Sequence, residues 1–263
     1  MNWETILVDR QGTLGRIVLN RPEQRNPLDA VMSAEILAAL RGHFDDPDVR
    51  SVAISANGDA FCAGADLKQV RALPDLKAAE AYRWPADIVA AHELMLEAPK
   101  PVIAAVGGPA YAGGLGLAGM CDVVIATENA TFATPEVKIG LFPMIIVAHL
   151  ARAIPRKVLL EMMFTGDPID AAEAHRIGLV SRVVADRDAL DAAVADYARK
   201  FERVSPEAVR LGRQTFSILA DMPAEAALRS AQFFNTTFFG SDDFAEGTAA
   251  FVEKRRPGWD PGA

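Results

Sequence analysis

The sequence predicts an α/β fold with a buried, parallel sheet in its N-terminal half and a helical C-terminal part. Short runs at 49–56, 101–106 and 121–127 are almost continuously apolar and alternate with helical stretches, which is typical of parallel strands buried on both faces. After about residue 145 the apolar spacing becomes helical and alanine-rich. The chain has 263 residues, of which 51% are hydrophobic, so it can bury a sizeable core.

The first expected elements are a hairpin and a helix. β-rich runs at 5–10 and 14–20 flank a turn marked by Gly12. A proline-punctuated loop follows, and Asp29 is the expected N-cap of a helix that runs to about Arg41.

The next segments combine strands, glycine loops and helices. The strand at 49–56 leads into a glycine-bearing loop, which is followed by a helix expected over 77–96. The strand at 101–106 leads into a second glycine loop and a short helix. A strand–strand–helix theme thus recurs loosely. Beyond it we expect mainly helices, with one short β run. These helices are expected over 145–164, 170–177, 187–203, 206–220, 223–238 and 243–256.

The charge balance and the cysteines restrict the function. Lys and Arg number 27 and Asp and Glu 35, a net charge of −8 that argues against a nucleic-acid partner. An anionic small ligand stays compatible with this balance if basic residues cluster locally. Cys62 and Cys121 form no disulfide framework and suit a reducing compartment. Since no signal peptide and no apolar run of roughly 18 residues is visible, we expect a cytoplasmic protein without a membrane partner.

Neither a metal site nor a dinucleotide site is favoured. The four histidines show no metal-ligand spacing, and neither cysteine has a near partner, so we expect no metal. Residues 114–119 read GLGLAG and match the dinucleotide fingerprint. Seven residues, however, separate this segment from the strand that ends at Val106, whereas the fingerprint follows its strand almost directly. Close helix packing and a tight turn explain these glycines better.

Two glycine loops, residues 57–67 and 107–119, each follow a buried strand. Glycine lets a backbone approach a ligand closely, so the loops could aim two N–H groups at one point, as in an oxyanion hole. The second loop opens a helix at Gly113-Gly114, whose N-terminus would add positive potential there. From the loops alone, two ordinary glycine turns remain the alternative.

Short motifs run in order along nearly the whole chain. They are Asn20-Arg21-Pro22, 61–67 (FCAGADL), 99–106 (PKPVIAAV), Cys121-Asp122, Phe132, 135–141 (PEVKIGL), 159–168, 177–180 (IGLV) and 251–257. In this combination the chain resembles the enoyl-CoA hydratase/isomerase (crotonase) superfamily. Each piece is short, but the combination is highly specific.

The resemblance implies a crotonase-like spiral of ββα turns over 1–200 and a helical region over 201–263 that takes part in assembly, as a homotrimer or as a hexamer made of two trimers. It implies an acyl-CoA thioester as substrate and no separate cofactor. In the family the thioester carbonyl lies between two backbone N–H groups, which match Ala65 and Gly113 here. Because these N–H groups are already in position, they stabilise the negatively charged enolate of the thioester more than they stabilise the bound substrate.

Family hydratases carry two glutamates, and one of them is matched here. The glutamate of the PE motif is Glu136, whereas the other position is Gly116, which has no side chain. Two carboxylates can hold water for hydration, but one is enough to move a proton between carbons, as in family members that shift the double bond of 3-enoyl-CoA. Residues 142–149 replace a glycine-rich family loop with bulky apolar side chains, so we expect a dry pocket that raises the pKa of Glu136. Taken alone, a glutamate after proline could simply cap or solvate a loop.

The resemblance also implies where the nucleotide part of CoA binds. The matching positions lie in the loop after Pro22, around the GAD motif and on the last helix, where they can act from a neighbouring subunit. They are Gln24, Arg25, Ala63, Asp66, Leu67, Lys68, Phe251 and Lys254. Positive charges there would offset the CoA phosphates on an acidic protein. Helix-terminal cations and solvated lysines are the alternative. Trp84 and Ile88 are expected to line the acyl pocket.

We therefore expect an acyl-CoA enzyme of fatty-acid metabolism in which Glu136 is the single acid/base for isomerisation or weak hydration of an enoyl-CoA. A catalytically silent CoA-thioester-binding protein is the first alternative, because Gly116 lacks the family carboxylate. A nicotinamide-dependent oxidoreductase, resting on GLGLAG, is the second. The sequence leaves open whether Glu80, Asp87 or Glu93 replaces the missing acid.

Overall fold

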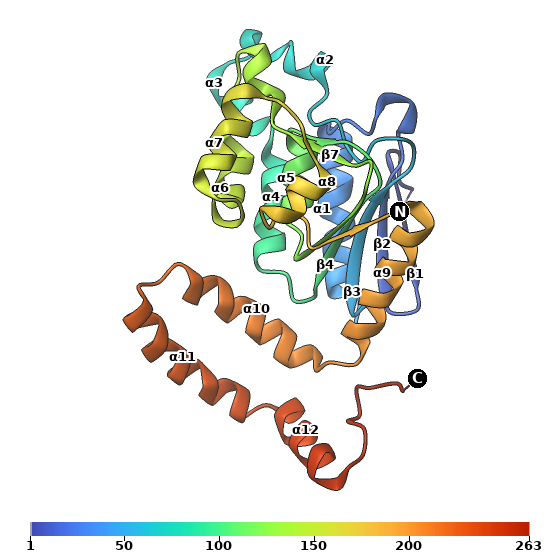
Figure 1. Cartoon of the computed structure of the whole chain (residues 1–263), viewed down its shortest axis with the longest axis vertical. Coiled ribbons are helices and arrows are strands. Elements are labelled where there is room, and N and C mark those ends of the chain that lie inside the picture. The colour runs from blue at the N-terminus through green and yellow to red at the C-terminus, as the bar shows by residue number, and fades with distance from the viewer. Residues whose placement is uncertain (1, 263) are drawn as a thin grey trace.

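A mixed β-sheet forms the centre of the molecule. The structure, a computed structural model, describes residues 2–262. Over these residues the larger sheet has six strands in the order β1-β2-β3-β4-β6-β9, in which β1 is antiparallel to β2 and the other neighbours are parallel (Figure 1). The strands span β1 Ile6–Gln11, β2 Leu14–Leu19, β3 Ser51–Ala56, β4 Val102–Val106, β6 Val123–Thr127 and β9 Arg182–Val184.

The β1–β2 hairpin and the first helix form where Gly12, as a turn residue, and Asp29, as an N-cap, predict them. Gln11 pairs with Leu14, so the turn has two residues, and Gly12 adopts the left-handed φ of +61° that such turns favour. The Asp29 side chain accepts the N–H of the third residue of α1 (Ala30–Asp45) at 2.8 Å, which caps the helix.

A second sheet has three strands in the order β5-β7-β8. Two strands of the larger sheet, β4 and β6, are each followed along the chain by a strand of this second sheet. β4 is followed by β5 (Ala110–Tyr111) and α5 (Gly113–Gly119), and β6 is followed by β7 (Thr131–Ala133) and the 3₁₀ helix η3 (Pro135–Ile139). β8 (Ile169–Asp170) completes this sheet. The strand–strand–helix theme is therefore confirmed, and the β5 strand also explains why GLGLAG lies away from β4.

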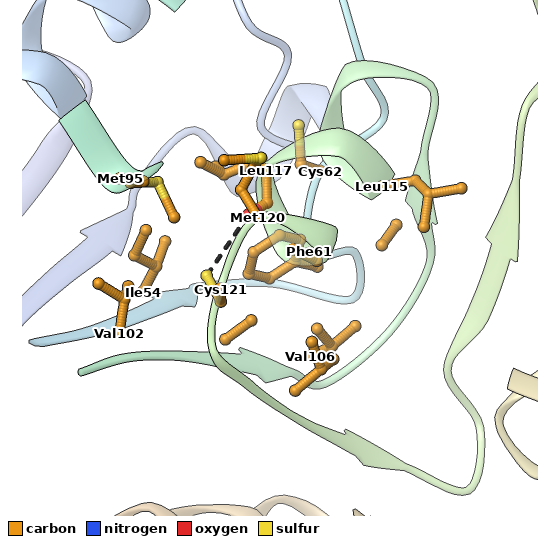
Figure 2. Packing of buried hydrophobic residues seen from close by; sticks show 14 of the residues in the cluster. Ile54, Phe61, Cys62, Met95, Val102, Val106, Leu115, Leu117, Met120 and Cys121 are labelled. Carbon is orange, nitrogen blue, oxygen red and sulfur yellow. Dashed lines mark hydrogen bonds between the residues drawn. The ribbon is translucent and has the colours of Figure 1, made fainter. Parts of the chain in front are cut away.

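Side chains of the parallel strands alternate between two cores. Ile54 of β3 belongs to the larger core, to which α1, α4 (Ala86–Leu96) and α5 contribute, whereas Ala53 packs in a smaller core with α9 (Arg187–Glu202). Figure 2 shows Phe61 of the first glycine loop and Leu115 of α5 among the packed side chains of the larger core. The loops are thus anchored by apolar side chains beside their glycines.

Two helices expected from the sequence, 77–96 and 145–164, are each broken at a proline. The first divides into α3 and α4 at Pro85, and the second into α6 and α7 at Pro155. Proline has no N–H to donate and its ring clashes with the preceding turn. The bounds are α3 Ala78–Arg83, α6 Met144–Ala153 and α7 Arg156–Thr165. Shorter elements are η1 Pro22–Gln24, α2 Leu67–Val70, η2 Leu73–Asp75 and α8 Ala171–Arg176.

Three C-terminal helices, α10 (Pro206–Ala220), α11 (Ala224–Phe239) and α12 (Asp242–Glu253), extend away from the sheet (Figure 1). They expose large apolar side chains; Phe233 of α11, for example, is 72% exposed. An ion pair ties α10 to the core, since Arg213 Nε lies 2.9 Å from an Asp122 carboxylate oxygen. None of the helices within residues 2–262 combines the length and the apolar character that a bilayer-spanning segment needs.

Candidate active site

An apolar cavity of about 470 Å³ lies where the two glycine loops meet α1, α4, η3 and α6. Ala65 and Gly113 line it from the loops, and Glu136 lines it from η3. The other lining residues are mostly apolar and include Leu28, Leu67, Trp84, Ile88, Ile139, Leu141, Phe142, Met144, Ile145 and Ile146. Trp84 and Ile88, which are expected from the sequence to line the acyl pocket, both line this cavity.

The Ala65 amide is left unpaired by a short parallel bridge. Leu28 donates its N–H to the Gly64 carbonyl at 2.7 Å and accepts the Asp66 N–H at 3.0 Å. In a parallel pair, the residue between two such partners directs its own N–H and C=O away from the other strand. Accordingly, the Ala65 N–H has no acceptor within the described part of the chain, and Ala65 lines the cavity.

The Gly113 amide is the first of α5, so it has no acceptor within the helix. The preceding Ala112 is fixed by its N–H, which donates to the Ala133 carbonyl at 2.9 Å, and it adopts φ +50° and ψ −124°, a conformation that strongly favours glycine. The loops touch here: a Cβ on Gly64 would lie 3.3 Å from the Gly113 nitrogen and 2.6 Å from the Ala112 Cβ. The two amide-bearing loops are therefore packed directly together at the cavity.

Glu136 carries the carboxylate that faces the same cavity. Its Oε2 is buried and has no hydrogen-bond partner among residues 2–262. Burial raises the pKa of the Glu136 carboxyl above its ordinary value, as the apolar side chains of residues 142–145 lead one to expect. A backbone hydrogen bond from the Leu141 N–H to the Glu136 carbonyl fixes the η3 turn at 3.0 Å.

Gly116 faces protein rather than open cavity. A Cβ placed there would lie 2.2 Å from Cγ2 of Ile146 on α6, so that side chain fills the space next to the glycine. Glu80, Asp87 and Glu93 are all exposed and do not line the cavity, so in this structure none of them places a carboxylate there. Within the described chain, no three His, Cys, Asp or Glu side chains gather as a metal site.

Two histidines, His92 and His149, lie beside Gly116. His92 lines the cavity and is 7% exposed, and its Nε2 is buried without a partner in residues 2–262. His149 donates from Nε2 to the Gly116 carbonyl at 3.1 Å, and the two rings meet edge to face at 5.2 Å. Trp84, Ile88 and His92 are spaced four apart, and this spacing could have placed His92 on the pocket face.

Acid should destabilise the folded protein through this pair of buried histidines. Burial, reinforced by His149, lowers the pKa of His92 to about 3, and burial lowers that of His149 to about 4, whereas the unfolded chain titrates near 6.5. Stability is therefore fully present above about pH 6.5 and is lost toward pH 4, by about 1.4 kcal/mol per pH unit for each histidine. Urea unfolding at pH 7 and 5 should show a smaller loss for His92→Phe than for the wild type; equal losses would contradict the assignment.

Residues matched to the nucleotide site are divided between two places. Arg25 and Ala63 line a second cavity of about 490 Å³, and Ala63 also lines the cavity that Glu136 faces, so the two cavities adjoin. The Ala63 N–H donates to the Arg25 carbonyl at 3.0 Å. Asp66 has a structural role, since its side chain accepts the Lys68 N–H at 2.7 Å and caps α2. Gln24 is exposed at the end of η1.

Phe251 and Lys254 are not brought to either cavity by the single chain. Phe251 lies on α12 and is 87% exposed, and Lys254 ends that helix in a left-handed conformation. Figure 1 places α12 at the opposite end of the molecule from α2. A contact between these residues and a ligand at the cavities would therefore need a second copy of the chain.

Comparisons with known proteins agree with this architecture. The family model described as enoyl-CoA hydratase/isomerase matches residues 9–262. A Mycobacterium bovis protein named probable enoyl-CoA hydratase is 39% identical over 98% of both chains, and the mouse mitochondrial enoyl-CoA hydratase domain-containing protein 3 is 36% identical over 95% of this chain and 82% of its own. The crystal structure of a Mycobacterium smegmatis enoyl-CoA hydratase matches with a TM-score of 0.91 at 35% identity, covering 97% of this chain and 99% of its own. The crotonase-like fold is thereby confirmed, and the chain belongs to the enoyl-CoA hydratase/isomerase family.

Proposed function

We propose that the protein is an acyl-CoA enzyme that stabilises a thioester enolate and moves one proton with Glu136. The observation that carries this proposal is that Ala65 and Gly113, whose backbone amides have no acceptor among residues 2–262, line one apolar cavity together with Glu136, whose Oε2 is buried. In a cavity of low dielectric, such fixed donors favour the charge that develops on the carbonyl oxygen. No separate cofactor takes part in this proposal.

The reaction that suits a single carboxylate is isomerisation of 3-enoyl-CoA to 2-enoyl-CoA. The thioester oxygen accepts hydrogen bonds from the Ala65 and Gly113 amides, while Glu136 removes a proton from C2. The electron pair delocalises over the carbonyl and the double bond, and Glu136 returns the proton to C4. The raised pKa of Glu136 brings the carboxyl closer to the operating pH, which favours both transfers.

The neighbouring cavity suits the polar end of the CoA thioester. Ala63 belongs to both cavities, so a ligand can extend from the acyl cavity past Ala63 toward the exposed Arg25. The guanidinium of Arg25 can offset a phosphate charge there. Leu67 of α2 lines the acyl cavity, and the next residue, Lys68, is exposed.

A silent CoA-thioester-binding protein is the second candidate. It is favoured by Gly116 and by Ile146, which together exclude a carboxylate where family hydratases carry one. The two candidates separate in one experiment: turnover of 3-enoyl-CoA and 2-enoyl-CoA of matched chain length, alongside calorimetric titration with the saturated thioester. Turnover supports the enzyme, binding without turnover supports the silent protein, and absence of binding contradicts both.

Restoring the missing glutamate alone should not restore hydration. In Gly116→Glu, the new Cβ meets Ile146 at 2.2 Å, so we expect a loss of stability of about 1–3 kcal/mol from overpacking and no gain in hydration of 2-enoyl-CoA. The double variant Gly116→Glu/Ile146→Ala makes room and should hydrate faster than the Ile146→Ala variant. Thermal unfolding and a hydratase assay test both statements; a gain in the single variant would contradict the role of Ile146.

Assembly into trimers is proposed from the exposed C-terminal helices. No residue of α10 or α11 is buried in the single chain, and Phe216 and Phe233 are 71% and 72% exposed. We expect light scattering to give three or six times the chain mass of 28.2 kDa. A single-chain mass at micromolar concentration would contradict this.

We also propose a cytoplasmic location, although some relatives carry mitochondrial names.

A further inference from the structure

The segment that pairs with the first glycine loop has an unusual backbone conformation. Arg25 and Asn26 follow each other with φ of +63° and +52°, in the left-handed region that residues other than glycine rarely adopt. Asparagine tolerates this region better than most residues, but arginine does not share that advantage. Two such residues in succession persist only where the surrounding structure fixes them. The contacts of Asn26 identify what fixes the segment here.

The Asn26 side chain is fully buried and bonds to backbone groups on both of its polar atoms. Its Nδ2 donates to the carbonyls of Asn57 and Ala60, at 2.9 and 3.0 Å, and its Oδ1 accepts the Arg21 N–H at 2.8 Å. Asn57 and Ala60 lie at the start of the first glycine loop, residues 57–67. Asn26 lines neither the acyl cavity nor the adjoining one, so any effect it has on a ligand there is indirect.

Backbone hydrogen bonds connect the segment around Asn26 to the Ala65 amide. On one side of Asn26, the Arg25 carbonyl accepts the Ala63 N–H at 3.0 Å. On the other side, Leu28 forms the parallel bridge that leaves the Ala65 N–H without an acceptor. The direction of the Ala65 N–H therefore depends on where the segment that carries Asn26 lies.

We propose that Asn26 is a positioning residue, which directs the Ala65 amide at the oxygen of the bound thioester. This inference rests on the proposed function, in which the Ala65 amide is one of two donors to that oxygen. Without the two hydrogen bonds from Asn26 Nδ2, the start of the glycine loop and the segment beside it can move relative to each other. The Ala65 N–H then loses its alignment, and a misaligned donor stabilises the enolate less, because hydrogen bonds weaken steeply away from a straight geometry.

The test observes the thioester carbonyl itself and needs no turnover. Butyryl-CoA labelled with carbon-13 at the carbonyl is bound to the full-length protein, and infrared difference spectra give its C=O stretching frequency, which hydrogen bonds to the oxygen lower. One variant is Asn26→Asp, which keeps the shape of the side chain but cannot donate when ionised. The other is Asn26→Gly, which adopts a left-handed backbone without strain. Asn129→Asp is the matched control, because Asn129 is exposed in the turn after β6 and lines neither cavity.

We expect the wild type and Asn129→Asp to lower the stretching frequency equally, relative to the free thioester. Both Asn26 variants should lose about half of this shift, since one of the two donors is misaligned. In turnover of 3-enoyl-CoA they should lose kcat and change KM little.

An unchanged shift in a folded Asn26 variant, even one with a lower melting temperature, overturns the positioning role and leaves the proposed function standing. If Asn26→Asp does not fold, Asn26→Gly decides. Absence of any shift in the wild type overturns the proposed function, and the role of Asn26 with it.

Discussion

Replacing Glu136 by glutamine should lower kcat for 3-enoyl-CoA isomerisation roughly a thousandfold, the typical contribution of a positioned acid/base. Glutamine keeps the size and the hydrogen-bonding reach of the side chain but cannot take the C2 proton, so KM should change little. The Oε2 atom of Glu136 has no hydrogen-bond partner within residues 2–262 that the amide would lose. Steady-state kinetics with 3-enoyl-CoA measure the effect directly.

The matched control is Glu128→Gln, a change of the same chemistry at an exposed glutamate that does not line the acyl cavity. It should leave kcat within about twofold of the wild type, since surface substitutions rarely perturb a distant site. Equal rates in the wild type and Glu136→Gln would remove Glu136 from the mechanism. A fall in both variants would point to a general loss of folded protein.

Gly64→Ala should reduce kcat by about 10²- to 10³-fold, which is the effect of losing one oxyanion donor in other enzymes. Gly64 has φ +93°, and an added Cβ would lie 2.6 Å from the Ala112 Cβ and 3.0 Å from the Tyr111 carbonyl. To relieve the clash, the loops must separate, which moves the Ala65 and Gly113 amides apart. The expected signature is a loss in kcat together with a lower melting temperature.

Gly12→Ala separates backbone strain from displacement of the amides. Gly12 also has a positive φ, of +61°, but a Cβ there meets nothing within 4 Å. This variant should lose about 1–2 kcal/mol of stability through the left-handed backbone and keep its activity. If Gly64→Ala retained wild-type kcat while losing only stability, the close packing of the two loops would not matter for catalysis.

The strands and the caps were predictable because their causes are local. Alternating or continuous apolar runs fix which segments enter the sheet, and Asp29 caps α1 through a side chain only three residues away from its partner. The helices broken at Pro85 and Pro155 were expected as continuous because the apolar spacing persists across each proline. There the backbone constraint outweighs the pattern.

The site was predictable in part. Ala65, Gly113 and Glu136 lie on one cavity, as the resemblance implied, because their loops follow adjacent strands. The contact of Ile146 with the space next to Gly116 could not be foreseen, since it depends on how α6 packs against α5. Such contacts between distant segments leave no pattern in the sequence near Gly116.

Backbone amides form one wall of the acyl cavity, and apolar side chains that can be substituted form the other. The amides of Ala65 and Gly113 survive almost any substitution that spares the glycines around them, whereas Ile88, Met144 and Ile145 can be exchanged one by one. New acyl preferences can thus arise by ordinary point mutation without disturbing the chemical step. Efforts to redirect this protein toward other thioesters should begin on α4 and α6 and leave the loops untouched.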